Sequence, residues 1–268
     1  MSLRSLLWAA LLSPTSAIAV SPQSTDAVEI MRAVEDRELG DRSVARLEIE
    51  ITDKAGRKRS RTVRSWSMDF EDSRKQLMLF ESPADVRNAG LLSVDYDDPA
   101  RSDDQWLYLP SLSKTTRISG ADKSGSFMGT DLTYADMTRR DIEDYEYAIL
   151  EASAEVGGEA VWLIEARPKT DQERSETGYL KTHIWVSKDK LVPVQSKAWV
   201  SEGKRLKYTQ FKDIKKVDGL WIAHTIGVRT VRNGQVESSS ALVFTSIAFD
   251  QEEVTADSFS ERRLEQGL

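Results

Sequence analysis

The stretch RSDDQWLYLPSLSKTTRISGADKSGSFMGTDLTYADMTRR, residues 101–140, differs from the rest of the chain and organises it. A strand, QWLYLP, leads through a short polar strand into a Gly/Ser loop that carries Phe127 and Met128. The following DLTYADM predicts one helical turn. A loop of this length inside a compact β domain is typically functional or disordered. Aromatic residues on both sides argue against disorder, so we expect a working part of the protein here.

Outside this segment, short runs of alternating apolar and polar residues are separated by turn residues, a pattern typical of antiparallel strands. Residues 44–52 (VARLEIEIT) alternate cleanly, whereas residues 75–82 (KQLMLFES) are apolar on both faces and indicate a central strand. Asp-Gly at 218–219 and Asn-Gly at 233–234 are strong hairpin signals. We predict a mainly β fold, a meander of about ten to eleven antiparallel strands.

A few helices complete the prediction. Residues 24–39 place apolar side chains at helical spacing after a possible N-cap, Asp26, and residues 252–264 predict a short helix. Residues 169–177 are polar and charged and predict a loop. A sheet of this many strands curls or closes, so the N-terminal helix is a candidate to fill or cover its concave face. No linker divides residues 20–268, which we expect to form one domain.

The first 19 residues have the pattern of a secretory signal peptide. A basic start, the apolar run LLWAALL and the small residues Ala17 and Ala19 fit export and cleavage; the alternative is a buried N-terminal helix. The apolar run is too short to span a bilayer, and no later segment is apolar enough to do so. The sequence contains no cysteine, so we expect neither a lipid anchor nor a disulfide. We predict a soluble periplasmic protein.

The sequence offers little catalytic chemistry. The net charge of −7 gives no basic surplus for nucleic acid, and no nucleotide-binding, hydrolase or zinc motif is present. His183 and His224 are not spaced as a metal pair, and a structural role on the sheet is favoured over catalysis. The acidic residues of 131–144 suggest either a hydrolytic carboxylate pair or, as we favour, a solvated loop with Asp131 as an N-cap.

Apolar binding is therefore the leading functional class, without a catalytic group, cofactor or metal. Phe127 and Met128 are equally compatible with packing as core under the loop and with facing a ligand or membrane. On the preceding strand, Trp106 and Tyr108 alternate with Leu107 and with Leu109.

Several of these stretches resemble the LolA-like group of outer membrane lipoprotein-sorting proteins. The resemblance is carried by residues 104–110 (DQWLYLP), Arg117-Ile118 and residues 124–137 (SGSFMGTDLTYADM), and more weakly by residues 185–194 and 218–222. It covers most of the chain after residue 19.

The resemblance implies a half-open, curled antiparallel β-barrel with the N-terminal helix and a short loop helix on its concave face. It also implies a periplasmic carrier of acyl chains of lipids or lipoproteins, possibly working with an RND-type inner-membrane exporter. The alternative is a periplasmic sensor or adaptor that resembles RseB and binds a membrane protein. The loop after Arg117 is a candidate moving part, with Asp131 and Asp136 structuring it. Residues expected to line the lipid site or its gate are Trp106, Tyr108, Arg117, Phe127, Met128 and Tyr134.

Overall fold

The computed structural model describes residues 20–37 and 40–268. The predicted signal peptide, residues 1–19, lies outside the described residues. Most of the described chain is β-strand, and three α-helices and six short 3₁₀ helices complete it. The strands are β1 (Arg42–Thr52), β2 (Lys58–Asp69), β3 (Ser73–Ser82), β4 (Gly90–Tyr96), β5 (Asp104–Leu109), β6 (Lys114–Ile118), β7 (Tyr145–Val156), β8 (Glu159–Pro168), β9 (Tyr179–Ser187), β10 (Pro193–Val200), β11 (Arg205–Val217), β12 (Leu220–Arg232) and β13 (Gln235–Phe249). The α-helices are α1 (Ala27–Glu35), α2 (Asp171–Thr177) and α3 (Glu261–Gln266).

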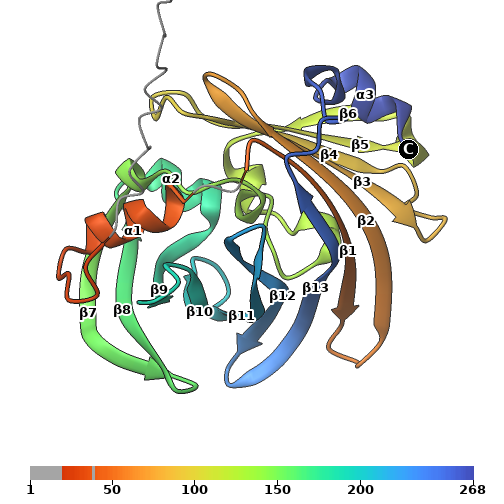
Figure 1. Ribbon diagram of the computed structural model, residues 1–268. Helices are drawn as coiled ribbons and strands as arrows, with labels where there is room; N and C mark the ends of the chain where they lie inside the picture. The colour runs from red at the N-terminus through yellow and green to blue at the C-terminus, as the bar shows by residue number, and fades with distance from the viewer. Residues whose placement is uncertain (1–19, 38–39) are drawn as a thin grey trace, which may run out of the picture.

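All the strands form one antiparallel sheet in the order β6-β5-β4-β3-β2-β1-β13-β12-β11-β10-β9-β8-β7. The sheet curls into an arch without closing, because β6 and β7 at its two ends do not pair (Figure 1). The half-open curled fold is confirmed, but the predicted strand number is wrong, since the sheet has 13 strands. Lys114–Ile118 is the short polar strand predicted after QWLYLP, and it forms one edge of the sheet.

One row of cross-strand neighbours shows which side chains share the concave face. Partners in an antiparallel pair point to the same side of the sheet. The row passes from β9 to β1 through Ile184, Ser196, Thr209, Val228, Ser240 and Ile51. Both the N-terminal and the C-terminal halves of the sheet therefore contribute to one continuous concave surface.

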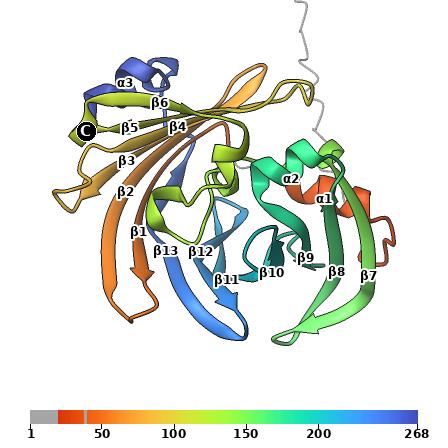
Figure 2. The same ribbon diagram turned by 180° about the vertical axis from the view of Figure 1, so that it is seen from behind.

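The chain passes from one edge strand, β6, to the other edge strand, β7, through residues 119–144, which we call the crossover segment. This segment contains four of the 3₁₀ helices: η2 (Gly120–Ser124), η3 (Phe127–Gly129), η4 (Ala135–Met137) and η5 (Ile142–Asp144). It lies on the concave side of the arch (Figures 1 and 2). The predicted helical turn in DLTYADM is present as η4.

The N-terminal helix α1 covers the other part of the concave face, over β7 to β9. Asp26 caps it as predicted, accepting hydrogen bonds from the backbone N–H groups of Val28 and Glu29 at 2.9 and 3.1 Å. The helix is shorter than the predicted 24–39, of which residues 38–39 lie outside the described residues. Its buried face packs against the β7–β9 side chains Tyr145, Trp162, Ile164, Ala166, Ile184 and Val186.

The convex face of the first half of the sheet is covered by the C-terminal residues and α3. In β3, Leu77 and Leu79 pack on this outer cluster, whereas Met78 and Phe80 pack under the crossover segment. The prediction of a central strand that is apolar on both faces is therefore confirmed.

The prediction of a loop at residues 169–177 is wrong, because most of this segment forms the helix α2. Thr170 caps this helix by accepting a hydrogen bond from the Glu173 N–H at 3.0 Å, and Gly178 ends it with a φ of 75°. The polar composition suggested a loop, but the capping threonine and the terminal glycine define the two ends of a helix.

Candidate functional site

The tip of the crossover segment packs on the sheet as part of the core. Phe127 is fully buried, with ring centroids 6.1 Å from Phe80 and 5.8 Å from Tyr134. Met128 is half-buried beside them, and the Arg61 guanidinium donates a hydrogen bond to its carbonyl oxygen. The sequence left open whether Phe127 packs in the core or faces a ligand, and in the structure it packs in the core.

Asp131 fastens the crossover segment to β12 and β13. Its buried carboxylate accepts hydrogen bonds from the hydroxyl groups of Thr230 at 2.6 Å and Ser240 at 2.7 Å, and also from Ser238. It does not cap η4, as the sequence had suggested, because all of these bonds go to the sheet. Asp131 therefore holds the loop in place by contacting residues that lie about a hundred positions later in the chain.

Asp136 supports the same segment locally. Its carboxylate accepts the Thr133 N–H at 2.8 Å, while its own N–H donates to the Thr133 hydroxyl at 3.1 Å, a reciprocal cap around the turn. The Tyr179 hydroxyl donates to the same carboxylate at 2.8 Å. Protein groups thus engage the carboxylates of both Asp131 and Asp136, which favours their structural role over hydrolysis.

The remaining predicted site residues fall into two groups on opposite faces. Tyr134 lies with Phe127 on the concave face, and its carbonyl oxygen accepts from the Gln105 side-chain amide at 2.9 Å. Trp106 and Tyr108 pack at the edge of the outer cluster under α3, and Arg117 forms an ion pair with Asp104. The alternation in QWLYLP separates the two faces, but sequence alone does not tell which face points inward.

A cavity of about 410 Å³ lies between α1, α2, the crossover segment and the sheet. The apolar part of its lining, which we call the floor, comes from the sheet and from α1: Ile184, Pro193 and Phe211 lie on β9, β10 and β11, and Met31 and Val34 lie on α1, while Thr182 and Ser196 add hydroxyl groups from the sheet. A volume of this size falls within the usual range for small-molecule sites.

The apolar floor continues across the sheet beyond this cavity. Phe211 faces Ile226 on β12, which faces Leu242 on β13. Leu242 is buried beneath the crossover segment, but Phe211 and Ile226 are only half-buried, because they lie between the areas covered by α1 and by that segment.

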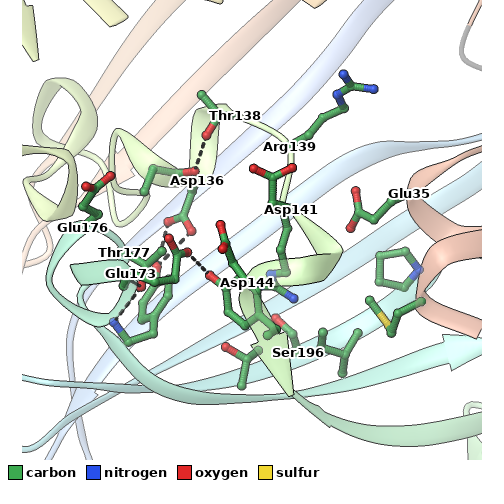
Figure 3. Close-up of a pocket in the computed structure, with 18 of the residues that line it drawn as sticks. Glu35, Asp136, Thr138, Arg139, Asp141, Asp144, Glu173, Glu176, Thr177 and Ser196 are labelled. Carbon is green, nitrogen blue, oxygen red and sulfur yellow. Dashed lines mark hydrogen bonds between the residues drawn. The ribbon is translucent and has the colours of Figure 1, made fainter. Parts of the chain in front are cut away.

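The opposite wall of the cavity is polar and mainly acidic. Glu35, Asp141, Asp144 and Glu173 lie around one space between α1, α2 and the crossover segment (Figure 3). Burial raises the pKa of each of these carboxyl groups, and that of Asp141 reaches about 6 because Asp103 and Asp144 also lie nearby. Arg140 lines the same wall, its guanidinium carbon 4.9 Å from the Tyr145 ring centroid.

Sequence reasoning missed most residues of this cavity. Its apolar members come from four elements far apart in the chain, and the helix that supplies Glu173 was expected to be a loop. Asp141 and Asp144 were noted only as part of an acidic cluster. The available signal was the change from apolar to charged residues at 137–144 (MTRRDIED), directly after the segment that crosses the sheet.

Both histidines are hydrogen-bonded on the sheet, as expected. His183 Nε2 lies 2.9 Å from a Glu165 carboxylate oxygen, and His224 Nδ1 lies 3.1 Å from the carbonyl oxygen of Asp213. Within residues 20–37 and 40–268, no group of three or more His, Cys, Asp or Glu side chains is arranged to hold a metal ion.

Comparison with known proteins places this geometry in a family. A family model described only as "uncharacterized protein" matches residues 72–266. A crystal structure described as an outer membrane lipoprotein-sorting protein domain from Vibrio parahaemolyticus is similar with 28% identity and a TM-score of 0.79, covering 89% of this chain and 98% of that one. The chain belongs to the family that this model describes, and its fold is LolA-like.

Two further structures share the fold of this LolA-like protein. A DUF1329 family protein from Desulfovibrio piger is 26% identical with a TM-score of 0.80, covering 89% of this chain and 97% of that one. A LolA superfamily protein from Nitrosomonas europaea, 18% identical with a TM-score of 0.66 and coverage of 88% and 98%, shows the common fold. A search of curated proteins finds no match. No helix in the described part of the LolA-like chain is long and apolar enough to cross a membrane.

Proposed function

We propose that this LolA-like protein is a periplasmic carrier for an amphiphilic cargo, a lipid or a lipidated protein. The observation that carries the proposal is the half-buried apolar floor of the concave face, around Phe211 and Ile226, which adjoins a cavity with a polar opposite wall. The description of the similar Vibrio structure as a lipoprotein-sorting domain supports it.

Physically, such a floor binds acyl chains without catalysis. Each CH₂ group removed from water contributes roughly 0.8 kcal/mol, so a chain laid on the floor gains several kcal/mol. The polar wall keeps the charged end of the cargo in contact with water and charged groups. Release then requires only that a partner or membrane bind the cargo more tightly, shifting an equilibrium between open and filled states.

The test places a charge on the floor. We expect Phe211→Asp to weaken uptake of a fluorescent fatty acid by about tenfold or more, because a buried carboxylate must be desolvated beside the chain. Val236→Asp is the matched control, since this valine is 52% exposed in the β12–β13 hairpin. Fluorescence titration measures uptake and circular dichroism confirms folding. Unchanged uptake by a folded Phe211→Asp protein would contradict the proposal, as would lipid-free protein from cells that takes up no fatty acid.

We also propose that cargo is exchanged with an inner-membrane transporter of the RND type, which the family resemblance suggests. Crosslinking in intact cells, followed by mass spectrometry, tests this partner. Recovery of an RND-type transporter would support it. Recovery of a signalling protein in a stable complex would favour the sensor or adaptor alternative.

A further inference from the structure

The charged wall of the cavity extends into a second hollow of about 400 Å³ between α1, β4 and the crossover segment. Seven carboxylate side chains line each hollow, and three of them, Glu35, Asp103 and Asp141, are shared, so that eleven carboxylates surround the two. Only four basic side chains accompany them. We call the two hollows together the acidic cleft.

Most of the basic groups are already paired. Arg32 lies 2.7 Å from Glu143, Lys123 lies 3.0 Å from Glu176, and Arg139 lies 3.1 Å from Asp97. These pairs leave the centre of the acidic cleft, including Asp103 and Asp141, with an excess of negative charge.

One carboxylate of the acidic cleft has an oxygen without a partner. Asp95 is 9% exposed, and its Oδ1 makes no hydrogen bond among the described residues, although its Oδ2 accepts from the Arg139 N–H at 3.3 Å. A buried polar atom left unpaired costs free energy, so such atoms are normally satisfied. An ammonium group in the hollow that Asp95 lines supplies the missing donor and offsets the repulsion between the carboxylates.

The electrostatic environment agrees with this requirement. Burial and the charge of Asp103 raise the pKa of Asp95 to about 7, and burial with Asp103 and Asp144 raises that of Asp141 to about 6. Both shifts come first from burial and then from neighbouring carboxylates, and Arg139, 4.0 Å from Asp95 Oδ2, offsets this negative charge only in part. An organic ammonium group carries the charge that complements these carboxylates.

Arg140 adds the opposite charge at the junction of the two hollows. It lines both, is stacked on Tyr145 and lies close to the Tyr147 hydroxyl, and it forms no ion pair with a carboxylate within 4.0 Å among the described residues. Its guanidinium therefore retains free donors, and guanidinium groups match phosphate geometry well. A head group that carries an ammonium beside a phosphate satisfies Arg140 and the carboxylates together.

We propose that the acidic cleft binds the zwitterionic head group of an aminophospholipid, with its ammonium at Asp95, Asp103 and Asp141 and its phosphate at Arg140. The acyl chains then lie on the apolar floor. The inference rests on the proposed carrier function and specifies its substrate class. It assigns the polar wall to head-group selection, and the floor to chain binding.

The experiment compares short-chain phospholipids of equal acyl length by isothermal titration calorimetry with the full protein. We expect dihexanoyl phosphatidylethanolamine to bind about tenfold more tightly than dihexanoyl phosphatidylglycerol, because only the former carries an ammonium group. Asp141→Asn is expected to remove most of this difference. Arg140→Gln is expected to weaken both lipids, and Arg140→Lys, which keeps the charge, to restore part of the binding.

Matched controls are Glu253→Gln and Arg262→Gln, two exposed residues away from the acidic cleft, which are expected to bind as the parent protein does. Equal or tighter binding of phosphatidylglycerol, or unchanged selectivity in a folded Asp141→Asn protein, would overturn the inference while leaving the carrier function intact. If neither phospholipid binds and no fluorescent fatty acid is taken up, the carrier function itself fails.

Discussion

Asp131 connects the crossover segment to the sheet through a single buried carboxylate. Three hydroxyl groups of β12 and β13 donate to it, so its loss leaves several buried polar groups unpaired. We expect Asp131→Ala to lower the free energy of unfolding by about 2–4 kcal/mol. Chemical denaturation measures the change, and Asp257→Ala at an exposed position is the control, expected within about 0.5 kcal/mol of the parent. A loss below about 1 kcal/mol would show that the segment is held by its apolar contacts alone.

Asp95 makes the stability of the protein depend on pH. Its pKa is about 7 in the folded state and lies near 3.9 in an unfolded chain, so the folded state binds the proton more tightly. This contribution favours folding at low pH and is lost as the pH rises through about 7.

We therefore expect Asp95→Asn, which removes the buried charge, to stabilise the protein by roughly 1–4 kcal/mol at about pH 8 and by less at about pH 5. Urea denaturation at both pH values measures the difference. An effect of the same size at the two pH values would contradict the role assigned to the charge.

At the scale of elements, the crossover segment and α1 share the concave face but are held differently. The crossover segment is fastened by buried hydrogen bonds, whereas α1 is held mainly by apolar packing on β7–β9 and by one exposed ion pair, Arg32 with Glu143. Exposed ion pairs contribute little. The loop after Arg117 was the predicted moving part, but buried hydrogen bonds anchor it to the sheet. We therefore expect α1 to move when cargo enters.

The packing of α1 is tested on its two faces. We expect Ile30→Ala to cost about 2–4 kcal/mol of unfolding free energy, because Ile30 is fully buried and the surroundings relax only in part. Val28 lies on the outer side of the same helix and is 39% exposed, so we expect Val28→Ala to change the free energy of unfolding by less than about 0.5 kcal/mol. Thermal and chemical denaturation of both variants measure the contrast. Equal effects would mean that α1 does not pack as described.

At the scale of the whole molecule, the open arch is what makes a hollow available. The edge strands β6 and β7 do not pair, and the crossover segment that joins them lies within the concavity (Figure 2). The first and last strands, β1 and β13, pair in the middle of the sheet, so both halves belong to one continuous surface. A single domain over residues 20–268 stays a prediction.

Local features were readable from sequence because their causes are local. The Asp218-Gly219 and Asn233-Gly234 turns connect strands as predicted, since all four residues adopt the positive φ values that these hairpins need. Asp26 caps α1 through neighbours two and three positions away. The missed helix α2 had a readable signal too, because Thr170 and Gly178 mark its ends.

The sequence by itself determined the strands, most turns, the first helix, the curled sheet and the family resemblance, all of which depend on periodicity or on motifs of neighbouring residues. Only the tertiary structure decided which face of each strand points inward. It placed Trp106 outside and Phe127 inside, set Asp131 against β12 and β13, and brought Arg140 to the acidic cleft. These placements depend on contacts between residues distant in the chain, which form when the sheet curls. Patterns of neighbouring residues therefore do not predict them.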